Sequence, residues 1–131
     1  RMPHYAVECL AGVLKKKRKK LSNSRILVLG VTYKKDVKDL RKSPSVKLIE
    51  ILQGKKCRVD YHDPFIPYLR ISTIDLKSVA LSKQNLSRYD CVVIATDHTR
   101  VDYKAVLDHA RAIYDVRNVY KGITSNKITK I

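Results

Sequence analysis

The chain has 131 residues, which is enough for one domain with a modest hydrophobic core. Its apolar content of 44% argues against global disorder, and no apolar run approaches the length of a membrane span. The formal net charge of +16 is large and attracts anions such as nucleic acid, membrane headgroups or nucleotides.

Residues 3 to about 20 are predicted to form a helix. Pro3 suits its first turn, and its apolar residues fall on one stripe: Val7, Leu10, Ala11 and Leu14. The helix precedes the first strand, so the stripe has no evident partner in the same domain. We therefore expect residues 1–22 to be the end of a larger element from a preceding domain, and residues 23–131 to be the domain proper.

From Arg25 onward, continuous apolar strands alternate with amphipathic helices. Strands are expected at 26–29, 57–61, 91–96, 112–116 and 127–131, and helices at 44–53 and 101–110. Ser43 is expected to cap the first of these helices and Pro44 to begin it. Residues 65–88 are poorly patterned and are assigned a short extended piece near 71–74 and helical turns near 76–81.

This alternation predicts an α/β fold, namely a Rossmann-like, three-layer, doubly wound parallel sheet. Ligands of such folds bind outside the carboxyl ends of the strands. The residues that follow the predicted strands are Gly30, Thr32, Tyr33, Lys34, Arg41, Asp63, Thr96, Asp97, His98, Arg117 and Asn118. Several cations and polar groups on one rim favour a phosphate or diphosphate ligand.

Taken singly, these residues have ordinary explanations. Lys34 is equally compatible with a plain loop charge, Asp63 before Pro64 with turn chemistry, and His98 with a surface or capping histidine. Arg117 is harder to explain away, because it follows a core strand where a neutral residue would serve. The turn after the first strand has Gly30 but no G-x-G-x-x-G, so this sheet should not cradle a dinucleotide by itself.

The three cysteines, Cys9, Cys57 and Cys91, have no metal-ligand spacing, and we predict no metal site. Their expected role is that of small buried hydrophobic residues in a reducing compartment. No secretory signal pattern opens the chain, and a cytoplasmic location is expected.

The segment RILVLGVTYKKDVKDLRKSPSVKLIEIL, with the later stretches VDYHDPFIP, CVVIATDHTRVDY and IYDVRN, resembles the C-terminal, UDP-binding domain of the UDP-glucose/GDP-mannose dehydrogenase family. The pattern D-x-x-D-x-R-x-S at Asp36, Asp39, Arg41 and Ser43 is quite specific for this family. MPHYAV and YKKDVKDLRKSP look more like the UDP-N-acetylhexosamine 6-dehydrogenase branch than the animal UDP-glucose branch.

The resemblance implies an NAD-dependent, four-electron oxidation of a sugar C6 alcohol to a carboxylate, giving a UDP-uronic acid. It places Tyr33, Lys34 and Arg117 on the UDP-sugar substrate and Arg41 on NAD, which the family holds mainly in its N-terminal domain. It further implies a homodimer or higher homo-oligomer and a role in polysaccharide biosynthesis.

The family's catalytic G-x-C-x-x-K-D motif is absent, so no catalytic residue is assigned here and the chain alone is expected to be inactive. Two other hypotheses remain open. The charge and the basic block at residues 15–20 are compatible with a module that binds nucleic acid or another polyanion, although no recognised nucleic-acid motif is present. The first helix with its apolar stripe could also act as a dimerising scaffold.

Overall fold

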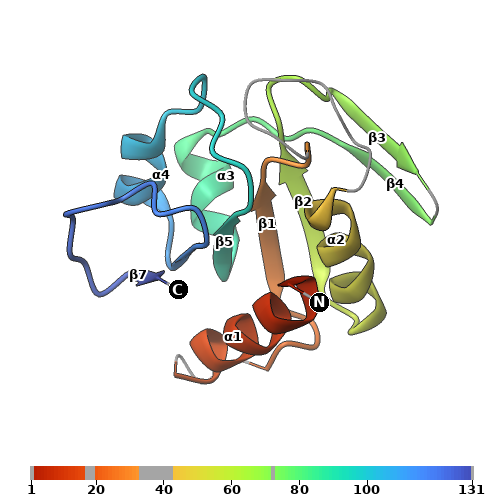
Figure 1. Ribbon diagram of the computed structural model, residues 1–131, viewed down its shortest axis with the longest axis horizontal. Coiled ribbons are helices and arrows are strands. Elements are labelled where there is room, and N and C mark those ends of the chain that lie inside the picture. The colour runs from red at the N-terminus through yellow and green to blue at the C-terminus, as the bar shows by residue number, and fades with distance from the viewer. Residues whose placement is uncertain (1, 17–19, 33–42, 72, 131) are drawn as a thin grey trace.

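The computed structural model describes residues 2–16, 20–32, 43–71 and 73–130. Its helices are α1 Met2–Lys16, α2 Pro44–Gly54, α3 Lys83–Arg88 and α4 Tyr103–His109. Its strands are β1 Arg25–Leu29, β2 Arg58–His62, β3 Tyr68–Ile71, β4 Ile74–Lys77, β5 Cys91–Ile94, β6 Ile113–Asp115 and β7 Ile128–Lys130. The arrangement of these elements is shown in Figure 1.

Five of the strands form one parallel sheet in the order β2-β1-β5-β6-β7. The chain runs from β1 to β2 on one side and then returns to β5 on the other side of β1. This order is that of a doubly wound fold with its topological switch point between β1 and β5. The predicted fold class is therefore confirmed, including the short final strand at the edge.

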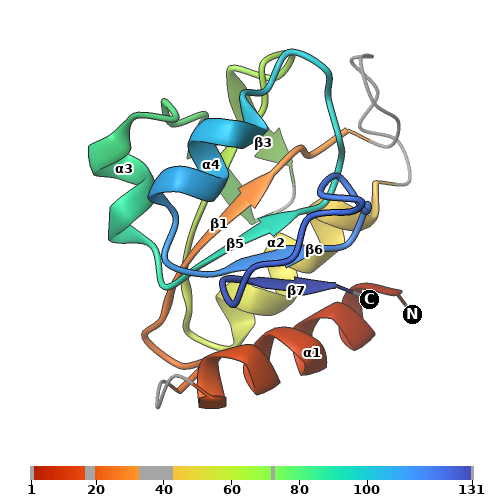
Figure 2. The ribbon, with the colours of Figure 1, turned by 90° about the vertical axis from the view of Figure 1, so that its left-hand side faces the viewer.

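Alternating side chains of each central strand enter two separate hydrophobic clusters. Ile26 and Val28 of β1 pack with α1 and α2, whereas Leu27 and Leu29 pack with α3 and α4. Figure 2 shows α3 and α4 in front of the sheet and α2 behind it. Burial on both faces explains why these strands read as continuous apolar runs in the sequence.

The apolar stripe of α1 has a partner that the sequence did not reveal, whereas the predicted domain division at residues 1–22 stays a prediction. Val7, Leu10, Val13 and Leu14 are buried in the same cluster as α2, against which α1 packs. Val13 takes part where the sequence pattern had suggested Ala11, which is half-buried. The helix ends at Lys16 in the described residues, so the expected extension toward residue 20 falls mostly on residues that are not described.

Residues 65–88 also differ from the expectation. The predicted helical turns near 76–81 are wrong, because Ile74–Lys77 pairs with Tyr68–Ile71 in an antiparallel hairpin. The helix in this region, α3, begins only at Lys83, where the Ser82 side chain accepts a hydrogen bond from the Asn85 amide. This N-cap, rather than the apolar spacing, sets the start of the helix.

The cysteines behave as predicted at two positions. Cys57 and Cys91 are buried, and burial raises the pKa of the Cys57 thiol, which makes it a poor nucleophile at neutral pH. Cys9 is half-buried.

Candidate functional site

At the switch point of the sheet, the loops that follow β1 and β5 are in close contact. The amides of Ala95 and Thr96 both donate to the Leu29 carbonyl, at 2.9 and 3.1 Å. Gly30 has φ +87°, and a Cβ at this position would lie 2.5 Å from the Thr96 Cβ. Only glycine combines this backbone conformation with this approach, so Gly30 brings the two loops together.

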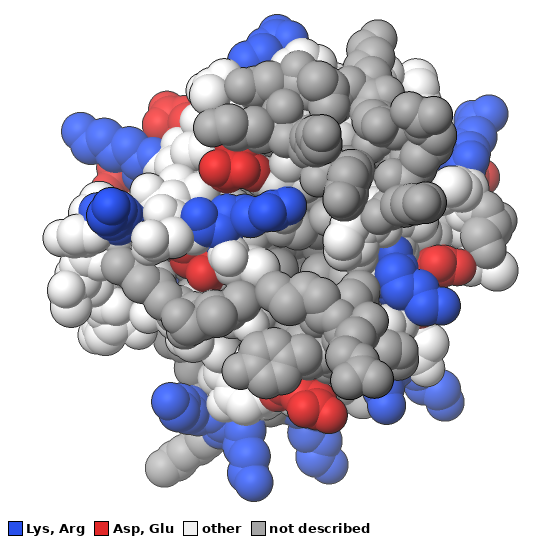
Figure 3. All heavy atoms as spheres, viewed as in Figure 1, with Lys and Arg blue, Asp and Glu red and all other residues white. Residues whose placement is uncertain are grey.

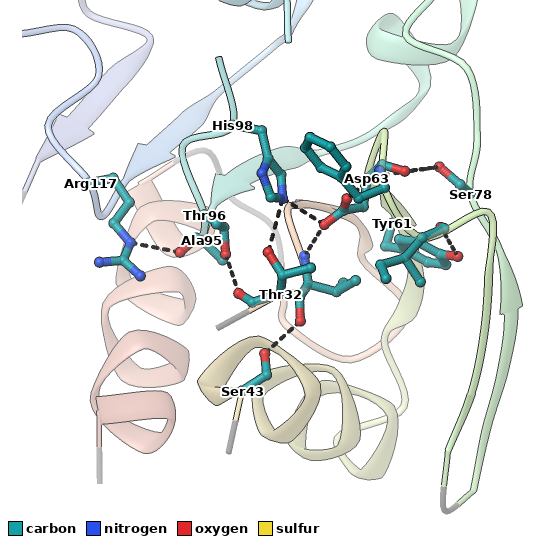
Figure 4. A network of polar contacts seen from close by, with 12 residues as sticks. Thr32, Ser43, Tyr61, Asp63, Ser78, Ala95, Thr96, His98 and Arg117 are labelled. Carbon is teal, nitrogen blue, oxygen red and sulfur yellow. Dashed lines mark hydrogen bonds and ion pairs between the residues drawn. The ribbon is translucent and has the colours of Figure 1, made fainter. Parts of the chain in front are cut away.

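Asp63, at the end of β2, is the centre of a buried polar network drawn in Figure 4. Its Oδ2 accepts hydrogen bonds from the Val31 amide at 2.8 Å and from His98 Nε2 at 2.9 Å, and its Oδ1 accepts from the Phe65 amide. His98 Nε2 also lies 3.1 Å from Thr32 Oγ1. Because a carboxylate oxygen can only accept here, Nε2 carries the proton, which fixes the histidine tautomer.

Two hydroxyl groups extend this network to the loop after β1. Thr96 Oγ1 donates to the Thr32 carbonyl at 2.7 Å, and Ser43 Oγ donates to the Val31 carbonyl at 2.6 Å. Ser43 precedes α2 as predicted, yet its side chain makes no capping bond to the helix. Its hydroxyl instead ties the start of α2 to the end of β1, across the segment 33–42.

The predicted rim residues therefore divide into two groups. Thr32, Asp63, Thr96 and His98 are buried and bonded to one another, so they shape the rim instead of facing a ligand. His98 is fully buried, so the interpretation of His98 as a surface histidine is wrong. Asp63 does serve the turn at Phe65, in addition to its long-range contacts.

Arg117 is the predicted site residue that the structure places at the rim with an exposed side chain. Its Nε donates to the Ala95 carbonyl at 2.9 Å, which holds the side chain beside the end of β5. Figure 4 shows the guanidinium group pointing away from the buried network. Among the described residues, this is the only hydrogen bond of the side chain, so the two terminal nitrogens remain available for a bidentate contact to an anion.

Two features of the rim were missed in the sequence. Asp115 ends β6 and accepts hydrogen bonds from the amides of Arg117, Val119 and Tyr120, which sets the turn that carries Arg117. Arg100 lies over the Phe65 ring, 5.5 Å from its centroid, and that ring packs on His98. In the sequence, the signal for Asp115 was a carboxylate at the end of a predicted strand, shortly before Asn118, a residue type common in turns. In the structure, Asn118 has φ +60°.

The other predicted ligand contacts lie outside the described residues. These are Tyr33, Lys34 and Arg41, together with Asp36 and Asp39 of the family pattern. Their assigned roles stay predictions. The described residues on either side, Thr32 and Ser43, are both buried at the rim.

The described residues do not form a cradle for the pyrophosphate of NAD. The space that a Cβ of Gly30 would need is filled by Thr96, and α2 begins only at Pro44, far along the chain from this glycine. A dinucleotide site needs a helix N-terminus directly after the glycine turn. Within the described ranges, no group of three or more metal-ligating side chains comes together, and no helix is both long and apolar enough to cross a bilayer.

Comparison with known proteins identifies the fold and its family. The family model described as "UDP-glucose/GDP-mannose dehydrogenase family, UDP binding domain" matches residues 27–122. The chain belongs to this family. The match spans the whole carboxyl rim, from β1 to the turn that follows Arg117.

Several relatives are named as UDP-N-acetylhexosamine dehydrogenases, the branch that the motifs of the sequence resemble, and others as UDP-glucose 6-dehydrogenases. UDP-N-acetyl-D-mannosamine dehydrogenase from Pyrococcus horikoshii is 34% identical over 126 residues, covering 92% of this chain and 28% of the relative. UDP-N-acetyl-D-glucosamine 6-dehydrogenase from Salmonella typhi is 24% identical over 124 residues, covering 90% of this chain and 29% of the relative. The chain thus spans less than a third of the length of these relatives.

A solved structure of the Pyrococcus horikoshii UDP-D-ManNAc dehydrogenase superposes with a TM-score of 0.77 at 30% identity. It covers all of this chain, which corresponds to 31% of the solved chain. The superposition includes α1, so the packing of this helix on α2 belongs to a fold shared with that enzyme.

Proposed function

We propose that this chain is the UDP-sugar-binding domain of a nucleotide-sugar 6-dehydrogenase and holds the uridine diphosphate moiety at the carboxyl rim. The position of Arg117 on the carboxyl rim, beside the end of β5, carries the proposal. Its guanidinium is oriented by one hydrogen bond to Ala95 and set on a turn fixed by Asp115. Such a preorganised cation loses little side-chain entropy when it binds a diphosphate.

The predicted partners of Arg117 are Tyr33 and Lys34, which follow Thr32 directly in the chain. Thr32 itself is held at the rim by its contacts with Thr96 and His98. We assign Tyr33 and Lys34 to the UDP-sugar and Arg41 to the cofactor NAD. The buried network of Asp63 holds Val31 through its backbone amide and lies beside Thr32 through His98.

In the intact enzyme, we propose that the UDP-sugar is oxidised at C6 with NAD bound mainly by another domain. The relatives act, by name, on UDP-N-acetyl-D-mannosamine or UDP-N-acetyl-D-glucosamine, and a UDP-N-acetylhexosamine is the substrate class we propose. Residues 1–22 would continue into an interdomain region, and the enzyme would work as a cytoplasmic homo-oligomer. The chain supplies binding and orientation of the nucleotide, and no catalytic residue.

The first test is calorimetric titration of UDP into the 131-residue chain at near-physiological salt. Arg117→Ala should weaken binding at least tenfold, because a bidentate charged contact to a phosphate is lost. Arg111→Ala is the matched control, since Arg111 is also exposed but lies before β6 and pairs with Asp90 at 3.9 Å, at the opposite end of the strands. Its affinity for UDP should equal that of the unmodified chain.

Lys34→Ala is a second variant that tests the assignment to UDP independently of Arg117. Unchanged UDP affinity in both Arg117→Ala and Lys34→Ala would refute the assignment of these residues to the nucleotide. If the chain does not bind UDP at all, the same titration on the longer parent enzyme decides, and absence of binding there would rule out the proposed function.

A further inference from the structure

A second cationic hollow lies at the opposite end of the sheet from the carboxyl rim. It has a volume of about 200 Å³ and is lined by Arg25, Arg58, Asp60, Arg88 and Tyr89. Arg25 and Arg58 are the first residues of β1 and β2, and Arg88 is the last residue of α3. Since the rim stands at the far ends of the same strands, the hollow is separate from the proposed nucleotide site.

The pairing of β1 with β2 places two arginines side by side. Arg25 and Arg58 are direct partners in the parallel register, in strands about 4.8 Å apart. The next residue of each strand, Ile26 and Val59, points into the cluster of α1 and α2, so both arginines point to the other face, toward α3. Like charges held this close repel each other, and the repulsion costs stability unless an anion lies between them.

The carboxylates near the hollow form hydrogen bonds with groups other than the guanidinium groups of Arg25, Arg58 and Arg88. Asp60 Oδ2 accepts a hydrogen bond of 2.7 Å from the Tyr89 hydroxyl. Asp90 accepts from the backbone amide of Arg25 and lies 3.9 Å from Arg111. In the described part of the chain, no ion pair joins a carboxylate to the guanidinium of Arg25, Arg58 or Arg88. Three cations therefore face one carboxylate across the hollow.

Ordinary explanations cover part of this arrangement. Arg88 ends a helix, where a cation is favourable, so Arg88 alone would not indicate an anion-binding site. Arg25 and Arg58 have no such explanation, because uncharged polar residues would suit the exposed start of a strand without repulsion. The hollow is smaller than the roughly 300–1,000 Å³ of pockets that enclose whole cofactors, so its size suits an anionic group and not a nucleoside.

We propose that Arg25, Arg58 and Arg88 form a binding site for a small phosphorylated anion, either a phosphate monoester or a diphosphate. Guanidinium groups bind phosphate oxygens bidentately, and two of them on neighbouring strands can grip one phosphate from two sides. Tyr89 holds Asp60 to one wall, which limits the repulsion between this carboxylate and the ligand. The anion would in turn relieve the repulsion between Arg25 and Arg58.

Pyrophosphate and inorganic phosphate are the probes, titrated into the whole chain at constant ionic strength and followed by amide chemical shifts. Saturable shifts at residues 58–60 and 88–90 are expected. Arg58→Ala should weaken binding at least tenfold. Arg25→Gln should weaken it as much, and this second variant keeps the proposal testable if Arg58→Ala disturbs the fold. Asp60→Asn should tighten binding, since it removes the negative charge from the wall.

Two controls separate this site from rim binding and from net charge. Arg117→Ala should leave these shifts and the affinity at residues 58–60 unchanged. Arg70→Ala removes another exposed arginine, which pairs with Asp75 in the hairpin, and it should also have no effect. The proposal is overturned if the unmodified chain shows no saturable shifts there, if Arg58→Ala and Arg25→Gln bind normally, or if Arg70→Ala weakens binding as much as Arg58→Ala.

Discussion

Asp63 accepts three hydrogen bonds from groups that are far apart in the chain, and each of them fixes a different part of the rim. The pair with His98 is fully buried, so removing either partner would leave an uncompensated polar group in the interior. This cost explains why the two residues are best regarded as supports for the rim. Arg117 and Arg100 are exposed cations among the described residues of this rim, and both are available to meet a ligand.

Gly30 provides the sharpest test of the close packing at the switch point. Gly30→Ala should lower the free energy of unfolding by roughly 2–4 kcal/mol, because it combines left-handed backbone strain with a clash against Thr96. Gly122→Ala is the control, since Gly122 has φ +79° with no atom within 4 Å of the added Cβ. It should cost only the strain of about 1–2 kcal/mol. Urea denaturation measures both, and equal losses would show that the contact with Thr96 is not restrictive.

Tyr61 predicts how stability depends on alkaline pH. Burial, and then the nearby Asp63 carboxylate, raise the pKa of Tyr61 to about 12 from its ordinary value of 10. The raised pKa means that the folded state keeps the proton longer than the unfolded state. The contribution is thus fully present below about pH 10 and is lost as the pH rises toward 12.

The pH profile of Tyr61→Phe isolates this contribution. The variant loses the hydrogen bond from the Tyr61 hydroxyl to the Ile66 carbonyl, so it should be less stable by about 1 kcal/mol at neutral pH. Between pH 10 and 12, however, its free energy of unfolding should fall less steeply than that of the unmodified chain. Lysines titrate in the same range but are common to both proteins. Parallel profiles would contradict the raised pKa.

At the scale of elements, α1 is a structural part of this domain. Its buried stripe packs on α2 and shares a cluster with β1, β2 and β5. The scaffold hypothesis, which relied on an unpartnered stripe, loses its basis for these residues. Any contact that α1 makes with another subunit would have to use its other face, which includes Glu8 and Gly12.

Leu10→Ala measures how strongly α1 is integrated. Leu10 is fully buried, so the substitution should cost about 2–5 kcal/mol in the free energy of unfolding. Gly12→Ala is the matched control in the same helix, because it is exposed, has open space around it, and should stabilise the helix by up to about 1 kcal/mol. Single denaturation transitions are expected for both. A Leu10→Ala chain as stable as the parent would mean that α1 does not belong to the folding unit.

The whole molecule carries 28 basic and 12 acidic residues. Figure 3 shows that, on the face it presents, the described lysines and arginines are spread around the molecule and not gathered into one stripe. A spread of this kind gives a general attraction for anions with little specificity. On this face, the described cations therefore do not form the continuous basic surface expected of a nucleic-acid-binding module.

Self-repulsion of this charge predicts a stabilising effect of salt. Raising NaCl from about 0.01 to about 0.1 M shortens the screening length from roughly 30 to 10 Å, which should raise the melting temperature by several degrees. Replacing the exposed Lys15, Lys16 and Lys20 with glutamine should raise the melting temperature at low salt and reduce its salt dependence. Differential scanning calorimetry measures both. A melting temperature that falls with added NaCl would show that favourable ion pairs outweigh the repulsion.

The sequence by itself determined the sheet and the edge at which we propose that the ligand binds. Short apolar runs such as 26–29 and 91–94, alternating with amphipathic helices, indicate strands buried on both faces. Parallel strands fix which residues follow them at one rim, so this reasoning predicted Arg117 at the rim, and the motifs indicated the family. These features are local, because each depends on a few neighbouring residues and on the period of a strand.

Only the tertiary structure showed which polar residues at the rim form hydrogen bonds with one another. Asp63 and His98 are 35 positions apart, and Thr32 and Thr96 are 64 apart, so no local pattern reveals their hydrogen bonds. The partner of the α1 stripe and the pairing of Arg25 with Arg58 were hidden for the same reason. Burial and like-charge proximity are properties of the folded chain, since they arise only when distant segments are brought within a few ångströms of each other.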